Sequence, residues 1–199
     1  MWYSYLYKKI MKLYLYRHSI TKGNLEKRYI GKTDENLCNE GYALAKDIKT
    51  DKSVKKVYTS ALIRSIETAE IFFPYAKIIK IPELNEMDFG DFENKNYVEL
   101  KDNIDYKFWI KSYCEIRCPN GESKKEFMKR CCKSFENIIN YEIQKEDNIY
   151  MVVHGGTIMS IMYTYSNSEK SYFDWNIKNC GCLEVDIDKN IWLKEKKFL

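Results

Sequence analysis

Residues 149–156 read IYMVVHGG, an unbroken apolar run that ends on His154 and two glycines. An apolar run of this length, without polar alternation, predicts a strand buried on both faces of a parallel sheet. The other histidine, His18, follows a second strand-like run at residues 12–16 and comes directly after Arg17. Because an open α/β sheet binds ligands at the carboxyl ends of its strands, both histidines are candidate site residues. Their spacing alone is equally compatible with two polar strand ends that share no role.

The rest of the chain alternates strand-like and helix-like segments. Further strands are predicted at residues 56–59, 77–81 and 181–187, the last forming a hairpin with residues 191–194. Helices are predicted at residues 40–48, at 61–73 with Ser60 as N-cap, in part of 97–116, after a capping box at 123–126, and at 157–163. This alternation predicts an α/β fold of three layers, α/β/α, with a mostly parallel central sheet.

The composition is that of a folded globular protein, with 45% hydrophobic and 31% charged residues. The net charge of +4 arises from 33 basic and 29 acidic residues that are interspersed along the chain, so nucleic-acid binding gains no support. No apolar run approaches the roughly 20 residues of a transmembrane helix. We therefore expect a cytoplasmic protein that binds neither nucleic acid nor a membrane.

The seven cysteines stand at positions 38, 114, 118, 131, 132, 180 and 182. Their odd number does not fit a disulfide framework, and the two histidines are already placed at strand ends, so a zinc site is disfavoured. We expect reduced thiols and no metal.

Residues 1–10 are rich in tyrosine and lack the apolar centre and cleavage site of a signal peptide. We expect them to be an extension outside a single domain that spans residues 11–199. An added strand, a loose arm and a translation-start artefact all stay open for this extension. Within the domain, an insertion at about 91–120 is expected to form a small helical cap.

A second arginine, Arg64, falls in the first turns of the helix that follows the strand at residues 56–59. In a parallel sheet, this places Arg64 on the same edge as Arg17 and both histidines. Arginine binds phosphate oxygens through two parallel N–H donors and stays charged at every working pH. Taken alone, Arg64 reads as a solvated helix residue. Its recurrence with the others at equivalent strand ends predicts a phosphoryl-binding pocket without a metal.

Five short motifs follow one another between residues 12 and 187. They read Arg17-His18-Ser19, SALIRSIETA at 60–69, LNEMDFG at 84–90, Gly121-Glu122-Ser123 and VVHGG at 152–156. In this order they resemble the histidine phosphatase superfamily, in the branch of cofactor-dependent phosphoglycerate mutases and related phosphatases. The resemblance implies a phosphoglycerate mutase-like fold and phosphoryl transfer that uses neither a metal nor a bound cofactor.

The resemblance also implies a role for each matching residue. His18 is the nucleophile, which forms a phosphohistidine. Arg17, Arg64 and His154 hold the phosphoryl oxygens, and Glu86 donates a proton to the leaving group. Further substrate contacts are expected from Asn24, Ser19 and Gly155.

The sequence departs from the family's pattern at three places. Ser19 stands beside the nucleophile, where the family has a small Gly or Ala because the backbone passes close to the phosphate. NLC at 36–38 replaces Pro-Leu-Thr, and FEN at 92–94 replaces Trp-Glu-Gly. These departures bear on the substrate more than on the reaction.

The implied roles agree with the chemistry of the residues. A nucleophilic His18 must be neutral, and nearby positive charges lower the pKa of its imidazole. Glu86 must be protonated to assist a leaving alkoxide, and Glu83 and Asp88 beside it in the sequence are expected to favour that form. Without the resemblance, a solvated loop glutamate is an equal interpretation of Glu86. Arginines can replace a metal because phosphoryl transfer needs mainly positioning and charge neutralisation.

Three functions are compatible with this site: a phosphomonoesterase, a mutase, and a non-catalytic phosphate-binding module. The third is disfavoured because every residue of the chemistry is present. The segment between Gly90 and Gly121 is shorter than in mutases of the family, so water reaches the intermediate more easily and hydrolysis is favoured. We expect a small phosphorylated metabolite as the substrate, and a homodimer stays open.

Aromatic residues are frequent in the expected cap. Core packing is the favoured interpretation, and stacking on a flat base of the substrate is the alternative. The residues concerned are Tyr97, Tyr106, Phe108, Trp109 and Tyr113.

Overall fold

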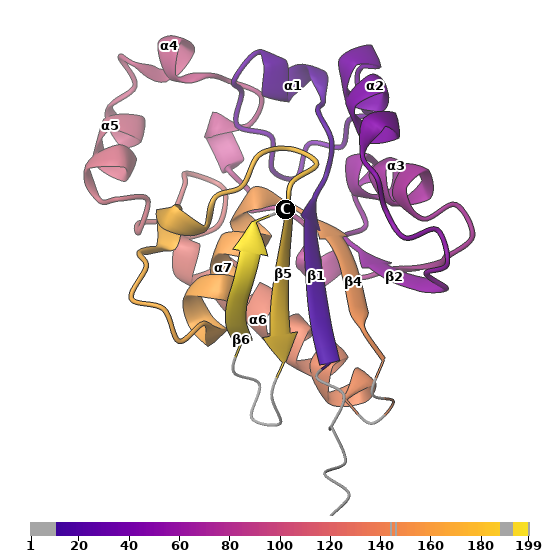
Figure 1. The fold of residues 1–199 in the computed structure, drawn as a ribbon. Helices are drawn as coiled ribbons and strands as arrows, with labels where there is room; N and C mark the ends of the chain where they lie inside the picture. Colours follow the sequence, from indigo (N-terminus) through magenta and orange to yellow (C-terminus); the bar gives the residue numbers. More distant parts are fainter. Residues whose placement is uncertain (1–10, 144, 146, 188–192, 199) are drawn as a thin grey trace, which may run out of the picture.

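The computed structural model describes residues 11–143, 145, 147–187 and 193–198. Its centre is a six-stranded sheet with the order β3-β2-β4-β1-β5-β6 (Figure 1). Four neighbouring strands are parallel, namely β1 (Met11–Arg17), β2 (Lys56–Thr59), β3 (Lys77–Lys80) and β4 (Ile149–Val153). The antiparallel strands are β5 (Cys182–Ile187), beside β1, and β6 (Leu193–Phe198), beside β5. The predicted mostly parallel sheet is confirmed.

Helices cover both faces of the sheet, which gives the predicted three layers (Figure 1). One face carries α6 (Lys124–Glu142) and α7 (Gly155–Tyr165), and the other carries α2 (Asn39–Asp47) and α3 (Ile63–Phe72). Alternate strand residues pack into the two cores: Met151 of β4 lies in the first and Val152 in the second. The unbroken apolar run of β4 therefore meets apolar side chains on both sides, as predicted.

The longest helix, α6, begins where the capping box predicts. The Ser123 hydroxyl accepts from the backbone N–H of Glu126, and the Glu126 carboxylate accepts from the backbone N–H of Ser123. Phe127, Cys131 and Phe135 lie at helical spacing on its buried side. These contacts fix the first turn of α6 beside the loop that contains Glu86.

Two helix starts differ from the prediction. Ser60 is not an N-cap, because α3 begins two residues later with Leu62 at the cap position. The Ser60 hydroxyl instead lies 2.7 Å from Nε2 of His154, so a tertiary contact overrides the local capping preference. Helix α7 begins directly after His154, at Gly155, which is two residues before the predicted start.

Short helices make up much of the remaining chain. The polar segment after β1 contains α1 (Lys22–Leu25), and residues 91–120 contain α4 (Tyr97–Leu100) and α5 (Ile104–Lys111). Three 3-10 helices complete the set: η1 (Pro82–Leu84), η2 (Gly90–Phe92) and η3 (Tyr172–Trp175). In Figure 1, α4 and α5 lie to one side of the carboxyl ends of the parallel strands.

The cap has its own small core. Tyr106 and Trp109 of α5 are buried with Phe92 and Leu100, whereas three of the five aromatic residues named above are exposed. Core packing is therefore confirmed for Tyr106 and Trp109 and is wrong for Tyr97, Phe108 and Tyr113. The short helices α4 and α5 have too few turns to bury every aromatic side chain.

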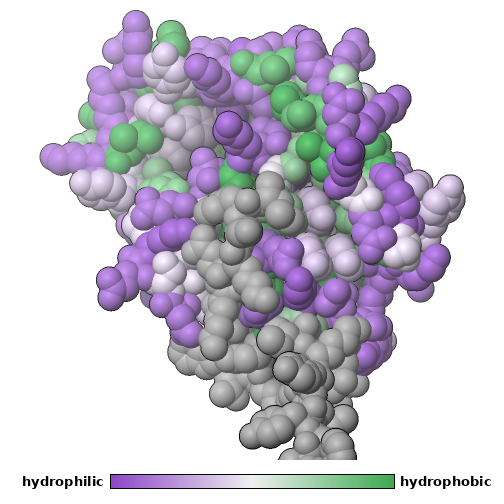
Figure 2. Space-filling view, viewed as in Figure 1, coloured by the Kyte–Doolittle hydropathy of each residue, from purple (hydrophilic) through white to green (hydrophobic). Residues whose placement is uncertain are grey.

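The face of the molecule seen in Figure 2 is mainly hydrophilic. Its hydrophobic residues gather toward the upper right, where Figure 1 draws α2. In the described ranges, no helix is long and apolar enough to cross a membrane.

All seven cysteines are unpaired, and five are buried. The extension at residues 1–10 and part of the predicted hairpin, residues 191–192, lie outside the described residues.

Candidate active site

The two histidines meet at the carboxyl edge of the sheet. The parallel register sets Arg17 opposite Val153, so β1 and β4 end at the same level. The backbone N–H of His18 extends this pairing and donates to the Val153 carbonyl at 2.9 Å. The imidazole centroids of His18 and His154 are 5.1 Å apart. The predicted convergence of these residues is therefore observed.

The His18 imidazole is fixed through one ring nitrogen, which leaves the other nitrogen free. Its Nδ1 lies 2.6 Å from the carbonyl oxygen of Ser19, which can only accept, so the ring proton is on Nδ1 and the Nε2 lone pair is free. Burial lowers the pKa of His18 well below its ordinary value, and the charges of Arg64 and Arg17 lower it further. The imidazole is therefore neutral, as nucleophilic attack requires.

His154 is held from its Nε2 side. The Ser60 oxygen accepts from the N–H of Leu62 at 3.3 Å, and its hydroxyl proton faces Nε2 of His154 at 2.7 Å. When the Ser60 hydroxyl donates to Nε2, the ring proton is on Nδ1. Burial and the neighbouring charge of Arg64 lower the pKa of His154, so this ring is also neutral. Its Nδ1–H is a donor without a partner among the described residues.

Both arginines are fixed by their outer nitrogens. Nη1 of Arg17 donates to the carbonyl of Ile177 at 2.7 Å and to Oδ1 of Asn176 at 3.2 Å. The Arg64 guanidinium, which is fully buried, donates to the carbonyls of Thr33 and Gly31 at 2.8 Å each. Burial lowers the pKa of both arginines, although the charge of Glu86 opposes this shift. Arginine nevertheless stays protonated in proteins, so both guanidinium groups carry a positive charge.

Three buried donors at this edge lack a partner in the part of the chain that the structure describes: Nε of Arg17, Nε of Arg64 and Nδ1 of His154. A buried N–H without an acceptor is unfavourable by about 1–3 kcal/mol, so each of them selects for an acceptor that is not a protein group. A phosphoryl group offers three such oxygens and the negative charge that two arginines favour. We call Arg17, His18, Arg64 and His154 the phosphoryl pocket.

Glu86 borders the same cavity as Arg17. One carboxylate oxygen accepts from the N–H of Gly156 at 2.9 Å, and the other accepts from the N–H of Met87 at 2.9 Å. A β-carbon on Gly156 would lie only 2.2 Å from this carboxylate, so glycine at this position is what allows Glu86 to approach α7. The donor that the sequence predicts is therefore docked at the start of the helix that follows His154.

The expected acidic surroundings of Glu86 are wrong. Glu83 is exposed, and the Asp88 carboxylate accepts from Nζ of Lys32 at 3.0 Å and from the N–H of Gly90 at 2.8 Å. Glu83 lines a different cavity from Glu86, and Asp88 is paired with Lys32. Arg17, Arg64 and Arg130 supply the charges that act on Glu86 instead.

Two of the remaining predicted residues make internal contacts. The Ser19 hydroxyl donates to the Gly41 carbonyl at 2.7 Å, and Oδ1 of Asn24 accepts from the N–H of Thr21 and from Asn179, both at 3.2 Å. The single hydroxyl proton of Ser19 is thus already used within the protein. Substrate contacts by Ser19 and Asn24 stay predictions.

Gly155 lies against an arginine of the phosphoryl pocket. A β-carbon on Gly155 would lie 3.4 Å from Cζ of Arg17, so the glycine leaves the face of that guanidinium uncovered. Its contact with a substrate also stays a prediction.

A cavity of ≈ 340 Å³ opens beside these groups and is lined in part by Arg17, Glu86, Gly155 and Gly156. The rest of its lining is largely aromatic. We call this set the aromatic wall: Tyr29, Phe89, Trp109, Phe127, Tyr172 and Phe173. Lys124 also lines the cavity, with Nζ 4.2 Å from the Tyr172 ring centroid and 2.5 Å from a Glu115 carboxylate oxygen.

Several of these residues were missed from the sequence. Ser60 follows a predicted strand, as the two histidines do, but its position before a predicted helix favoured the role of an N-cap. Asn176 and Tyr172 carry no local signal, because their relation to the site depends on how the chain returns after α7. Across the described ranges, no group of three or more His, Cys, Asp or Glu side chains is arranged to hold a metal ion.

Comparison with known proteins agrees with this geometry. The sequence profile of the histidine phosphatase superfamily (branch 1) matches residues 13–197. An adenosylcobalamin/alpha-ribazole phosphatase of Escherichia coli is 30% identical over 155 residues, which cover 74% of this chain and 75% of that protein. A 2,3-bisphosphoglycerate-dependent phosphoglycerate mutase of Bartonella tribocorum is 29% identical, over 75% of this chain and 79% of the mutase.

A solved structure shares the fold as well. The alpha-ribazole phosphatase of Shigella flexneri superposes with a TM-score of 0.78 at 26% identity, over 94% of this chain and 96% of that chain. These relatives include both phosphatases and phosphotransferases. The profile match across nearly the whole described chain, together with two buried histidines at the ends of β1 and β4, shows that this protein is an enzyme of the histidine phosphatase superfamily.

Proposed function

We propose that the protein is a metal-independent phosphomonoesterase that acts through a phosphohistidine at His18. The observation that carries this proposal is the free Nε2 of a neutral, buried imidazole beside three unpartnered donors of the phosphoryl pocket. A nucleophile and a cradle for three oxygens are what phosphoryl transfer needs from a protein.

The proposed reaction has two balanced steps. Nε2 of His18 attacks phosphorus, the bond to the ester oxygen breaks, and protonated Glu86 gives its proton to the leaving alkoxide. A bound phosphate dianion repels the Glu86 carboxylate and so favours its protonated form in the complex. In the second step, Glu86 takes a proton from water, and the resulting hydroxide displaces His18 and releases inorganic phosphate. Arg17, Arg64 and His154 donate hydrogen bonds to the three equatorial oxygens throughout, and the two arginines neutralise their charge.

Hydrolysis is favoured over mutase activity by the length of the cap. Residues 91–120 contain only two short α-helices, α4 and α5, so we expect this cap to exclude less water than a longer insertion would. A mutase must retain the phosphorylated intermediate until the same substrate returns. Product analysis separates the two, because a phosphatase releases inorganic phosphate and a mutase produces an isomeric phosphate ester.

We extend the proposal to the substrate, a small phosphorylated metabolite. Stacking surfaces in the aromatic wall suit a flat, apolar group on the leaving alcohol. The names of the Escherichia coli and Shigella flexneri relatives support alpha-ribazole 5'-phosphate, which carries such a group, and a place in cobalamin biosynthesis in the cytoplasm. A broad-specificity sugar or nucleotide phosphatase is the alternative.

A substrate panel tests both the proposed mechanism and the proposed substrate. Alpha-ribazole phosphate, 3-phosphoglycerate, sugar phosphates and nucleotides are compared by kcat/KM, with release of inorganic phosphate as the readout. Brief reaction with ³²P-labelled substrate, followed by alkaline quenching and mass analysis, locates the phosphoryl group. Phosphate release without a label on His18 would overturn the mechanism. Equal kcat/KM across the panel would remove the preference for alpha-ribazole phosphate and leave the mechanism in place.

A further inference from the structure

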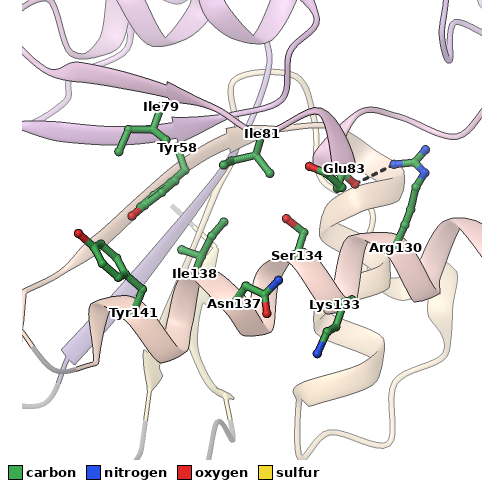
Figure 3. Close-up of a pocket in the computed structure, with 10 residues that line it drawn as sticks. All are labelled: Tyr58, Ile79, Ile81, Glu83, Arg130, Lys133, Ser134, Asn137, Ile138 and Tyr141. Carbon is green, nitrogen blue, oxygen red and sulfur yellow. Dashed lines mark hydrogen bonds between the residues drawn. The ribbon is translucent and has the colours of Figure 1, made fainter.

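Arg130 of α6 grips the backbone of the loop that contains Glu86. Its Nη1 donates to the carbonyls of Glu83 and Asn85 at 2.8 Å each, and its Nη2 donates to the carbonyl of Glu86 itself at 2.9 Å. Figure 3 shows the Arg130 side chain extending from α6 toward this loop, with its bond to Glu83 drawn. One side chain thus holds three carbonyls within four consecutive residues.

The remaining donors of Arg130 bind Glu122 of the Gly-Glu-Ser motif. Nε donates to Oε1 at 2.7 Å, and Nη2 donates to Oε2 at 2.8 Å, in the bidentate geometry of a strong ion pair. Glu122 holds the far end of the same loop, since Oε2 accepts from the N–H of Asp88 at 3.0 Å and its own N–H donates to the Asp88 carbonyl at 2.8 Å. Arginine has five N–H donors, and all five are used here.

The side chains of Leu84 and Met87 anchor the loop in the core, and Arg130 binds the backbone carbonyls between them. Glu86 lines the substrate cavity, whereas Glu83 and Arg130 line a second cavity of ≈ 600 Å³ between α6 and strands β2 and β3 (Figure 3). The loop therefore separates two open spaces. Burial disfavours the charge of Arg130, but the hydrogen bonds and charge of Glu122 outweigh it and raise the pKa of Arg130 overall.

The position of the Glu86 carboxyl follows from this backbone. Its own contacts are two N–H groups, one of the next residue, Met87, and one of Gly156 on α7. The first moves with the loop and cannot fix the loop. A displacement of about 1 Å in a reacting group can lower the rate by about 10²-fold, so the residues that locate the loop affect proton transfer.

We propose that Arg130 and Glu122 are positioning residues that hold Glu86 in place for proton transfer to the leaving group. The inference rests on the proposed phosphomonoesterase function and deepens it. In the described structure neither residue hydrogen-bonds to the phosphoryl pocket; the Arg130 guanidinium lies 5.0 Å from the Phe127 ring centroid, and its charge also acts on His154, which is why the test variant keeps that charge. Their loss is therefore expected to impair only those reactions that need a proton from Glu86.

The variants Arg130→Lys and Glu122→Gln test this inference. Lysine keeps the charge but cannot make five directed hydrogen bonds, and glutamine keeps the shape but weakens the ion pair. On an alkyl phosphate such as glycerol phosphate, we expect kcat/KM to fall by about 10–10²-fold for Arg130→Lys and less for Glu122→Gln. On p-nitrophenyl phosphate, whose leaving group needs no proton, we expect less than about a threefold change.

A leaving-group series adds a readout that a purely structural role would not move. A set of aryl phosphates with phenols of increasing basicity is measured for each variant. When general-acid assistance is lost, log kcat/KM falls more steeply with leaving-group basicity. We expect this steeper slope in Arg130→Lys and in Glu86→Gln alike. The double variant Glu86→Gln/Arg130→Lys should lose less than about a further threefold on alkyl phosphates, because both changes remove one function.

Arg117→Lys is the matched control. Arg117 is an exposed arginine that also binds a carbonyl and a carboxylate, those of Gly121 and Glu126, but it does not contact the loop at residues 83–88. This variant should retain the wild-type slope and the wild-type rates on both substrate types.

Three results would overturn the inference: equal losses on alkyl and p-nitrophenyl phosphates, a wild-type slope in Arg130→Lys, or multiplicative losses in the double variant. Circular dichroism and the melting temperature show that each variant is folded, and Glu122→Gln serves if Arg130→Lys is not. Failure of the proposed function gives a different result. In that case the wild-type protein neither hydrolyses p-nitrophenyl phosphate nor forms a phosphohistidine when incubated with it.

Discussion

The phosphoryl pocket meets the aromatic wall at Arg17, which lines the same cavity as the wall, but the two are built in different ways. The pocket takes its side chains from the ends of neighbouring strands and the helix after β2, and most of its hydrogen bonds go to backbone carbonyls. The wall takes its side chains from loops and from α5, α6 and η3, and contacts between aromatic rings hold much of it together. In the proposed mechanism, the strand ends supply the groups for phosphoryl transfer, and we expect the segments outside the sheet to select the alcohol that is released.

The largest effect is expected from removing the proposed nucleophile, His18, because this change affects the phosphoryl pocket and not the aromatic wall. His18→Ala should lower kcat by about 10⁴–10⁶-fold on every substrate, because covalent catalysis is removed whatever the leaving group. No phosphorylated protein should form, and the melting temperature should stay close to wild type because the side chain lies at a strand end. Turnover at the wild-type rate would show that the pocket is not the reaction centre.

The general acid separates substrates by leaving group. Glu86→Gln should lose about 10²–10⁴-fold on alkyl phosphates and far less on p-nitrophenyl phosphate, since glutamine keeps the size and removes the proton. Initial rates on both substrates, with saturation curves, measure this ratio. Equal losses would assign Glu86 to phosphate positioning and would make Asp88 or His154 the next candidates for the proton donor.

The aromatic wall should affect only one class of substrate. Phe173→Ala removes a half-exposed ring of the wall and should lower kcat/KM for alpha-ribazole phosphate by about tenfold, because stacking on a flat base contributes about 1–3 kcal/mol. Glycerol phosphate should be unaffected. Phe108→Ala is the matched control, since Phe108 is also an exposed ring of the cap but does not line the cavity. Equal effects of both variants would contradict a role for the wall in specificity.

The pocket histidines should be visible in the pH dependence of stability. The pKa values of His18 and His154 are lowered in the folded protein, so below about pH 6.5 the unfolded state binds more protons than the folded state. The free energy of unfolding therefore has its full value above that pH. Below it, this free energy falls as the pH decreases, by about 1.4 kcal/mol per pH unit for each histidine. Urea titrations between pH 7 and pH 5 measure this slope, and His154→Gln should remove one histidine's share. An unchanged slope in that variant would refute the assignment.

The smallest effect is expected from metal removal. Two arginines and two neutral histidines supply the donors at the phosphoryl pocket, so dialysis against EDTA should leave the rate on p-nitrophenyl phosphate unchanged. A chelator-treated sample without and with added Mg²⁺ provides the comparison. A large loss that a divalent cation restores would point to a different chemistry.

Much of the phosphoryl pocket could be predicted because its signals are local. His18 and His154 follow apolar runs whose length and lack of polar alternation predict buried parallel strands, and parallel strands bring their ends to one edge. Arg64 needed only the assumption that its helix follows the neighbouring strand. The capping box of α6 was predicted for the same reason, since its four residues interact with each other.

The tertiary structure decided what depends on distant residues. Ser60 meets His154 across two strands, 94 positions apart in the chain, and this contact replaced the cap that its local sequence favours. The acidic stretch around Glu86 indicated repulsion between carboxylates, but Glu83 lines another cavity, Asp88 is paired with Lys32, and Arg130 of α6 binds the loop. A sequence specifies local conformation and periodic burial by itself, whereas the partners of a side chain depend on how distant segments pack. The reaction was therefore readable from the strand ends, and the positioning of its proton donor only from the folded chain.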